Sequence, residues 1–435
     1  MAQRASEIRM TAFTLPLSAT TDPSCVGPKA ANLAALARAG LPTPGGFCIS
    51  ADAYHRQLEH LGLGELMRHY AQADQPAQRR LAVEIRLMLY QEALAPDLSD
   101  EVVAAWRALQ MPAAVRSSAL IEDRADGNFA GQFESFLGIN SEAEFITALR
   151  ACWAALWTTT ARRSMAQHGN DPAQTAMAVL VQPLVAARAS GGGLSETADG
   201  QMLISATWGL GSTIAQGEVV PDRIVLSRQG FVRSNEAGRK HHRETCSHAA
   251  DGAGTGPQAV PPALVRAPCL KAGEATTLGR LMRKAEQVLG MPVEIEWALD
   301  DEGFKLLQAR PLHMQPAHLP DDIWLKHPGL NGHPAGIGWG SGRAVVVNCE
   351  CELTRVAPGD ILVTRVAGPA LSHILPRVGG VVAELGGSTS HLASLARERG
   401  IPAVLGVLDA TRRIPDGAQV AVDGVAGVVR WVANA

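Results

Sequence analysis

The segment Gly386-Gly387-Ser388-Thr389-Ser390-His391, continued by LASLARERGIPAV to Val404, decides how the C-terminal part of this sequence folds. Its two adjacent glycines indicate a tight turn, and Thr389 or Ser390 can cap the helix that follows. Gly400 and Pro402 indicate the end of that helix. The pattern therefore predicts a short helix with His391 in its first turn.

A histidine at the start of a helix has a specific chemical environment. The positive end of the helix disfavours the imidazolium ion and lowers the histidine pKa, which leaves a neutral nitrogen able to attack phosphorus. The unpaired backbone amides of the same turn can hold phosphate oxygens. An ordinary capping histidine in a glycine turn is the alternative, and these six residues alone do not exclude it.

Short apolar segments surround this helix and predict a β-rich α/β domain over residues 339–435. The predicted strands are 343–347, 361–364, 380–383, 403–405, 419–422 and 428–432. Before them, residues 313–338 contain four prolines and show neither a helical nor a strand period. We therefore expect a proline-containing hinge over residues 316–338.

The region before the hinge, residues 1–315, also has a mixed α/β pattern. Apolar spacing and many Ala, Leu, Arg and Glu residues predict helices between Ala51 and Gln110. Short apolar strands follow, separated by polar or glycine-rich loops. Residues 249–257 are poor in apolar side chains, which predicts a mobile surface loop there.

Two segments of this region can bind phosphate, although the sequence contains no P-loop motif. Lys29 lies at the start of a predicted helix, where its ammonium group and backbone amides can converge on an anion. Arg116 lies at a strand end, ahead of a small-residue loop that contains Gly131. A solvated lysine and a surface hairpin are the alternatives for each segment taken alone.

Residues 293–311 predict a hairpin that carries charge. Strand alternation puts Glu294 and Glu296 on one face, and Gln308 and Arg310 also share a face. A carboxylate, an amide oxygen and an arginine suit Mg²⁺ together with a terminal phosphate. An exposed charged hairpin is the alternative.

The segment around His391 resembles the phosphohistidine domain of the phosphoenolpyruvate-utilising enzymes, which include phosphoenolpyruvate synthase, pyruvate phosphate dikinase and rifampin phosphotransferase. Their motif, Gly-Gly-x-Thr-Ser-His followed by Ala-Arg-Glu-x-Gly-Ile-Pro-Ala-Val, matches residues 386–391 and 396–404. The N-terminal segments resemble the ATP-grasp domain of the same families, in the same order. The resemblance implies an ATP-grasp domain over 1–315 and a swivelling phosphohistidine domain over 339–435.

The resemblance also implies a role for each matching residue. The implied catalytic residues are His391, Thr389, Arg116 and Arg310. For the nucleotide, the resemblance implies that Lys29 and Arg116 contact phosphates and that Arg310 contacts the γ-phosphate. It further implies that Gly131 lies in the covering loop, that Gln182 lies near the adenine and that Gln308 contacts the nucleotide. The implied Mg²⁺ ligands are Glu296 and Gln308. Two segments depart from the family. Ser212 stands where an acidic contact is usual, and residues 190–195 replace a common motif, which predicts a looser loop there.

Bulk properties limit the kinds of ligand and the location. With 435 residues the chain is long enough for two or three domains, and a net charge of −3 gives no overall attraction for nucleic acid or an anionic membrane. The seven cysteines show no zinc-type pairs, the first residues lack an apolar signal core, and no stretch has the length of a membrane span. We expect a cytoplasmic protein that binds neither nucleic acid nor membrane.

The resemblance implies an ATP-dependent phosphotransferase of the dikinase type. His391 would take the β-phosphate of ATP in the presence of Mg²⁺, with AMP and phosphate as products, and pass the phosphoryl group to a small-molecule acceptor. No third, acceptor-binding domain is recognisable between the two domains, so a partner subunit that binds the acceptor is favoured over an acceptor site at the domain interface. A non-catalytic nucleotide-sensing subunit and a phosphocarrier charged by phosphoenolpyruvate are the alternatives.

Overall fold

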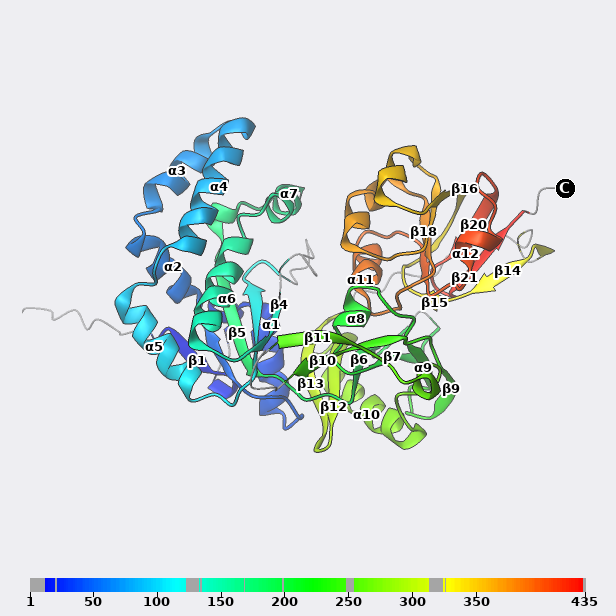
Figure 1. The fold of residues 1–435 in the computed structure, drawn as a ribbon, viewed down its shortest axis with the longest axis horizontal. Coiled ribbons are helices and arrows are strands. Elements are labelled where there is room, and N and C mark those ends of the chain that lie inside the picture. The colour runs from blue at the N-terminus through cyan, green and yellow to red at the C-terminus, as the bar shows by residue number, and fades with distance from the viewer. Residues whose placement is uncertain are drawn as a thin grey trace, which may run out of the picture. The chain divides into compact units, whose positions relative to one another are not determined.

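The computed structural model describes residues 12–432 except 20–21, 123–132, 134, 168, 198, 248–253, 313–323 and 325. The chain divides into two compact units (Figure 1). Unit 1 comprises the residues up to Arg38 and Pro44–Leu184, and unit 2 comprises Ala39–Thr43 and the residues from Val185 onward. Helices and strands alternate in both, so the predicted α/β class is confirmed.

Unit 1 contains a five-stranded antiparallel sheet in the order β1-β2-β5-β3-β4. Its strands are β1 (Thr14–Pro16), β2 (Phe47–Ile49), β3 (Ala113–Ala119), β4 (Ser135–Ile139) and β5 (Met177–Pro183). Its helices are α1 (Pro23–Arg38), α2 (Ala51–His60), α3 (Gly64–Gln72), α4 (Gln75–Gln91), α5 (Pro96–Arg107), α6 (Glu142–Ala155) and α7 (Thr159–Gln167). Helices α2 to α5 confirm the helical segment predicted between residues 51 and 110.

Local signals explain where these helices begin. The side chain of Asp74 accepts a hydrogen bond from the Ala77 amide at 2.9 Å and caps α4. Ser141 and Glu144 form a reciprocal capping box at the start of α6. Each cap satisfies backbone amides that have no partner inside the helix.

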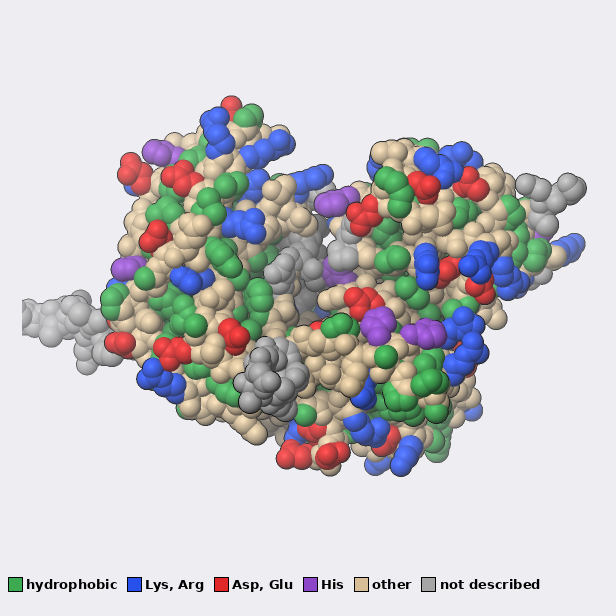
Figure 2. Space-filling view, viewed as in Figure 1, with side chains coloured by type: hydrophobic (Ala, Val, Ile, Leu, Met, Phe, Trp, Pro, Cys, Tyr) green, Lys and Arg blue, Asp and Glu red, His purple; other side chains and the backbone are tan. Residues whose placement is uncertain are grey.

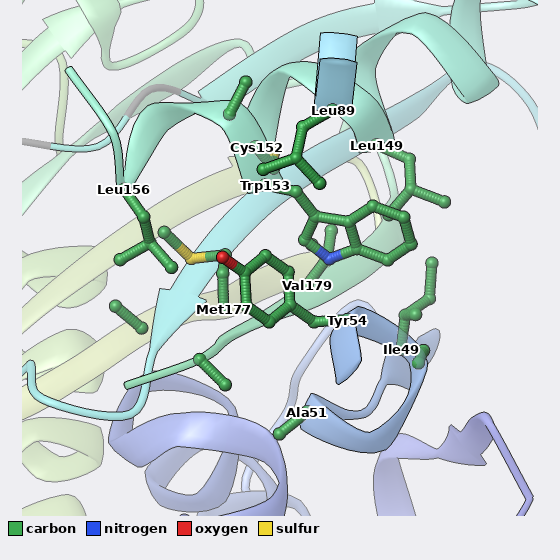
Figure 3. Packing of buried hydrophobic residues seen from close by; sticks show 14 of the residues in the cluster. Ile49, Ala51, Tyr54, Leu89, Leu149, Cys152, Trp153, Leu156, Met177 and Val179 are labelled. Carbon is green, nitrogen blue, oxygen red and sulfur yellow. The ribbon is translucent and has the colours of Figure 1, made fainter. Parts of the chain in front are cut away.

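Aromatic side chains from distant parts of the chain form the core of unit 1. Tyr54 of α2 and Trp153 of α6 are fully buried and meet edge to face, with ring centroids 6.2 Å apart (Figure 3). The Trp157 indole nitrogen donates to the Tyr54 hydroxyl at 2.9 Å, which satisfies both buried polar groups. Helix α2 is therefore fixed to α6 and the residues after it by side-chain packing and one hydrogen bond.

The first part of unit 2 is built on a six-stranded antiparallel sheet in the order β13-β12-β6-β7-β8-β9. These strands are β6 (Ala189–Leu194), β7 (Met202–Trp208), β8 (Asp222–Leu226), β9 (Val232–Glu236), β12 (Val293–Asp300) and β13 (Gly303–Pro311). Further elements are α8 (Ser212–Ala215), the hairpin β10 (His242–Ser247) and β11 (Gly254–Ala259), α9 (Pro262–Val265) and α10 (Ala272–Leu289).

The second part of unit 2 is an eight-stranded mixed sheet in the order β14-β21-β20-β16-β17-β18-β19-β15, with β16 to β19 parallel. Its strands are β14 (Gly329–Asn331), β15 (His333–Pro334), β16 (Trp339–Val347), β17 (Ile361–Thr364), β18 (Gly380–Ala383), β19 (Ala403–Leu405), β20 (Gln419–Asp423) and β21 (Val428–Trp431). Its helices are α11 (His391–Glu398) and α12 (Ala410–Arg413). The six strands predicted in this region are present.

Two local predictions for the segment from residue 249 to 338 are wrong. Residues 254–257, predicted to be loop, belong to β11 and pair with β10, because backbone hydrogen bonds hold a hairpin even where apolar side chains are few. Residues 329–334, predicted to lack strands, form β14 and β15 at the two edges of the eight-stranded sheet. The domain boundaries at residues 315 and 338 stay predictions.

The surface carries charges of both signs, and the chain contains a disulfide bond. On the face shown in Figure 2, acidic and basic side chains are mixed over the coloured residues, as the small net charge suggests. None of the helices in the described residues has both the length and the apolar composition that a membrane crossing requires. Cys349 and Cys351 form a disulfide bond.

Candidate active site

His391 is the first residue of α11, as predicted. The side chain of Ser390 caps the helix by accepting a hydrogen bond from the Ala393 amide at 3.3 Å. Gly386 has a φ of 91°, a conformation that favours glycine, and this produces the sharp turn before the helix. The helix ends at Glu398, and Gly400 follows with a φ of 67°.

The His391 imidazole is held neutral at physiological pH. Burial, and secondarily the positive charge of Arg310, lower the pKa of His391 to about 4. The sequence predicted the direction of this shift from the helix end, whereas the structure adds a buried environment and a nearby guanidinium. A neutral imidazole nitrogen is a competent nucleophile.

Arg310 of β13 contacts α11 directly. Its guanidinium donates to the Ser394 hydroxyl, pairs with Glu294 of β12 at 2.8 Å and lies 3.7 Å from the Glu398 carboxylate. His391, Ser394 and Glu398 are spaced three and four residues apart, so they form one stripe of α11. This stripe faces the β12–β13 hairpin.

The predicted metal ligands lie opposite each other on the same hairpin. Glu296 pairs with Gln308 across β12 and β13, and with Gly192 across β12 and β6. A β-carbon added at Gly192 would stand 2.5 Å from the Thr389 β-carbon. Directly paired residues share a face of a sheet, so the turn before His391 packs beside Glu296. Unit 2 therefore brings together His391, Thr389, Glu296, Gln308 and Arg310.

Three buried polar atoms around this turn have no hydrogen-bond partner within the described part of the chain. They are the Ser388 hydroxyl, the Thr389 hydroxyl and Nδ1 of His333. Burial and the charge of Arg223 lower the pKa of His333 to about 3, so this ring is also neutral. Buried hydroxyls without partners are unusual in a folded protein and are suited to contact a ligand's oxygens.

Unit 1 holds the predicted lysine against β3. Gly27 interrupts α1 with a φ of 76°, and a β-carbon there would stand 2.5 Å from the Ser118 carbonyl oxygen. Only glycine allows this approach, and the helix resumes at Pro28 with Lys29 in its first turn. The Lys29 ammonium donates to the Ser117 carbonyl at 2.7 Å and lies 3.5 Å from the Glu122 carboxylate.

The other predicted nucleotide residues of unit 1 lie on neighbouring strands. Arg116 is half-buried on β3, directly before Ser117, which Lys29 contacts. Gln182 is buried on β5, which pairs with β3, and its side-chain amide donates to the Gly45 carbonyl at 3.2 Å. Gly131 lies outside the described residues. Unit 1 thus places Lys29, Arg116 and Gln182 around the same two strands.

The two departures from the family have structural explanations. The glycine-rich segment predicted to be a loose loop is the buried strand β6, paired on both sides, so that prediction is wrong. Its glycines leave room for Thr389 at Gly192 and for Met282 of α10 at Gly193. The Ser212 hydroxyl donates to the carboxylate of Glu244 from β10, so an acidic group lies beside the serine.

Sequence reasoning missed three side chains of this cluster: Glu294, Ser394 and Arg397. The Glu294 carboxylate pairs with both Arg310 and Arg397, each at 2.8 Å. One signal was available, because Glu294 shares a strand face with Glu296 and therefore points the same way. Arg397 lies inside the motif that identified the helix, but its partner is more than one hundred residues away.

The metal-binding capacity of this site rests on two residues. Among the described residues, no group of three or more His, Cys, Asp and Glu side chains could hold a metal ion. The carboxylate of Glu296 and the amide of Gln308 nevertheless offer two oxygen ligands on one face. Mg²⁺ in phosphoryl-transfer sites is commonly held by one or two protein ligands, with phosphate oxygens and water completing its shell. The residues present therefore fit Mg²⁺.

Comparison with known proteins agrees with this architecture. Residues 23–323 match the family described as pyruvate phosphate dikinase, AMP/ATP-binding domain, and residues 356–427 match the family described as PEP-utilising enzyme, mobile domain.

Relatives of similar sequence include three phosphoenolpyruvate synthases. That of Aeropyrum pernix is 31% identical over 93% of this chain and 56% of its own length. Those of Pyrococcus furiosus and Pseudomonas aeruginosa are 29% and 32% identical, over 94% and 90% of this chain and 57% and 53% of their own lengths. The chain thus spans little more than half of these relatives.

Proposed function

This chain belongs to the phosphoenolpyruvate-utilising enzyme family, with its pyruvate phosphate dikinase type of AMP/ATP-binding domain and its mobile domain, and we propose that it is an ATP-dependent phosphotransferase of the dikinase type. One observation carries the proposal. A half-buried, neutral histidine at a helix start lies near an arginine and beside a carboxylate–amide pair suited to Mg²⁺. These are the groups that phosphoryl transfer to an imidazole requires.

The chemical steps follow from the state of His391. An imidazole nitrogen attacks the β-phosphorus of ATP, the bond from the β-phosphorus to the oxygen it shares with the α-phosphate breaks, and AMP leaves. Water then attacks the γ-phosphorus, phosphate leaves and one phosphoryl group remains on His391. The choice of the β-phosphate rests on the family likeness. The pKa of about 4 keeps the attacking nitrogen unprotonated throughout the physiological range.

Residues of unit 2 have distinct proposed tasks. Arg310 neutralises charge on the γ-phosphate, and the hydroxyl of Thr389 contacts the phosphoryl oxygens near His391. Glu296 and Gln308 hold Mg²⁺, which when bound offsets the negative charge of the phosphates. The cross-strand pairing of Glu296 with Gln308 supports this assignment.

Residues of unit 1 are proposed to hold the nucleotide. Lys29 and Arg116 contact its phosphates, Gln182 lies near the adenine and Gly131 belongs to the covering loop. Support comes from the half-buried arginine and the ammonium group that are held along β3. Guanidinium and ammonium groups are the usual protein partners of phosphate.

The phosphoryl acceptor is proposed to be a small molecule, presented by a partner subunit. The family models that match this chain describe an AMP/ATP-binding domain and a mobile domain, and the proposal adds an acceptor-binding partner to these two. The phosphohistidine domain, proposed as residues 339–435, would carry the phosphoryl group from the nucleotide-binding region 1–315. Residues 329–331 and 333–334 of the predicted hinge 316–338 are the strands β14 and β15 of the eight-stranded sheet.

Isotope labelling tests the proposed reaction. Purified protein is incubated with Mg²⁺ and ATP labelled at the β- or the γ-phosphate, and protein-bound acid-labile label and free nucleotides are measured. We expect β-label on the protein, with AMP and γ-labelled phosphate in solution. His391→Ala should bind no label, whereas His373→Ala, which changes an exposed histidine of the same domain, should bind as much as wild type. ADP as the only nucleotide product would refute dikinase chemistry.

The same experiment separates the alternatives. A nucleotide-sensing subunit would bind ATP and incorporate no label. A phosphocarrier charged by phosphoenolpyruvate would incorporate label from that compound and none from ATP.

A further inference from the structure

The Glu294 carboxylate is the centre of a buried ion-pair network that joins the six-stranded sheet to α11. One of its oxygens, Oε2, accepts hydrogen bonds from Arg310 and from Arg397, both at 2.8 Å. The other, Oε1, accepts from the Ser394 hydroxyl at 3.4 Å. The residue is only 8% exposed, and the side chains of both arginines are nearly as buried.

Two acids balance the two arginines of this network, because Glu294 pairs with both and Glu398 also lies 3.7 Å from Arg310. Burial raises the pKa of the Glu294 carboxyl, but Arg310 and Arg397 lower it further, so the net shift is downward and the group is ionised. A buried pair that loses one member leaves an uncompensated charge, which is strongly unfavourable. Arg397 therefore depends on Glu294 while α11 rests against β12, whereas Arg310 also has Glu398 beside it.

Arg397 extends this dependence to the turn that carries the nucleophile. Its second terminal nitrogen donates to the carbonyl of Ser388, three residues before His391, and to the Ala335 carbonyl at 3.3 Å. The guanidinium that Glu294 holds is thus the same group that holds the backbone before His391. A shift of Arg397 would move the turn as well as the helix.

Glu294 and Glu296 have different surroundings although they share a strand face. Glu296 is exposed and pairs across the strands with Gln308. Glu294 is buried, and both of its oxygens already accept hydrogen bonds. The β12–β13 hairpin therefore carries one carboxylate suited to a metal, that of Glu296, and one that is bound to α11 of the mobile domain, that of Glu294.

From this geometry we propose that Glu294 is a positioning residue, which acts through Arg397 and Arg310 to hold α11 where His391 can attack the nucleotide. The inference rests on the function proposed above and deepens it. In this proposal Glu294 holds the mobile domain in place while the phosphoryl group passes from ATP to His391, and it contacts neither ATP nor the metal.

The test compares Glu294→Gln with wild type in three measurements. The first is the rate of label transfer from ATP to His391 at saturating ATP. The second is ATP affinity, measured by calorimetry without divalent cation. The third is hydrogen exchange in the segment 384–390, since the Gly386 amide donates to the Val219 carbonyl at 3.0 Å and is protected only while α11 is seated.

We expect the transfer rate to fall at least tenfold, ATP affinity to change less than twofold, and exchange at Gly386 to accelerate at least tenfold. Glu286→Gln is the matched control, because Glu286 pairs with Arg228 at 2.9 Å away from α11, and it should match wild type in all three. In a double-mutant cycle, adding Arg397→Gln to Glu294→Gln should cost less than the product of the two single effects, because both changes break one contact.

Each other outcome overturns the proposal. A loss of ATP affinity without faster exchange would make Glu294 a nucleotide-site residue. A slower transfer with unchanged exchange and affinity would give it a chemical role, and a wild-type rate would remove any role. If wild-type protein formed no phosphohistidine, the proposed function would fail, and the exchange measurement alone would decide whether Glu294 seats α11.

Discussion

Replacing Gly192 with alanine should block the seating of the phosphohistidine turn while leaving the nucleotide-binding residues in place. A β-carbon at this position would lie 2.5 Å from the Thr389 β-carbon and 2.7 Å from its methyl and hydroxyl groups. Carbon atoms in ordinary contact are about 3.5–4.0 Å apart. The turn before His391 would therefore have to retreat by roughly 1 Å.

A displacement of this size is large for a nucleophile. Misplacing reacting groups by about 1 Å can slow a reaction about 100-fold, equivalent to about 2.7 kcal/mol in the barrier. We therefore expect Gly192→Ala to form phosphohistidine about 100-fold more slowly than wild type, in a rapid-quench measurement with labelled ATP. The affinity for ATP should be unchanged.

Gly193→Ala is the matched control for this experiment. It places the same methyl group one position along β6, where the nearest atoms belong to the flexible end of Met282. Both variants should unfold at similar urea concentrations, because both replace a strand glycine. If Gly192→Ala reacts as fast as Gly193→Ala, the contact between Gly192 and Thr389 does not belong to the reactive arrangement.

Three further predictions concern single side chains. The pKa of about 4 predicts that the rate of phosphohistidine formation at His391 is nearly constant from pH 6 to 8. Because the unfolded chain binds a proton at His391 more readily than the folded chain, the contribution of His391 to the free energy of unfolding should decrease as pH falls from about 6.5 towards 4. Unfolding of wild type and of His391→Ala, compared across this pH range, measures that contribution. Asp222→Ala leaves the fully buried Lys240 without its partner and should lower the free energy of unfolding by about 3–5 kcal/mol in urea titrations; an unchanged midpoint would contradict this. Glu296→Ala should raise the Mg²⁺ concentration for half-maximal phosphohistidine formation at least tenfold, and an unaltered Mg²⁺ titration would remove Glu296 from the metal site.

The features that were predictable from the sequence are those fixed by neighbouring residues. The glycine turn, the cap and the helix stop around His391 lie within twenty positions, and each has a local physical cause. The same holds for the β12–β13 hairpin, where alternation alone places Glu296 on the face of Glu294. The four helices between residues 51 and 110 follow from their apolar spacing.

The features that were missed depend on distant partners. Residues 190–194 looked like a loop because glycines disfavour strands, yet the approach of Thr389 and Met282 requires glycine at this point of β6. The pairing of Glu294 with Arg397 joins positions that no local pattern relates. Strands β14 and β15 are only three and two residues long, too short to show alternation.

Strands β14 and β15 lie at opposite edges of the eight-stranded sheet. Strand β14 pairs with β21 at one edge, β15 pairs with β19 at the other, and the Gly332 amide donates to Gly427 at 2.8 Å between them. A pull through the preceding chain would therefore be shared by both edges of the sheet, and residues 329–334 would move together with the sheet.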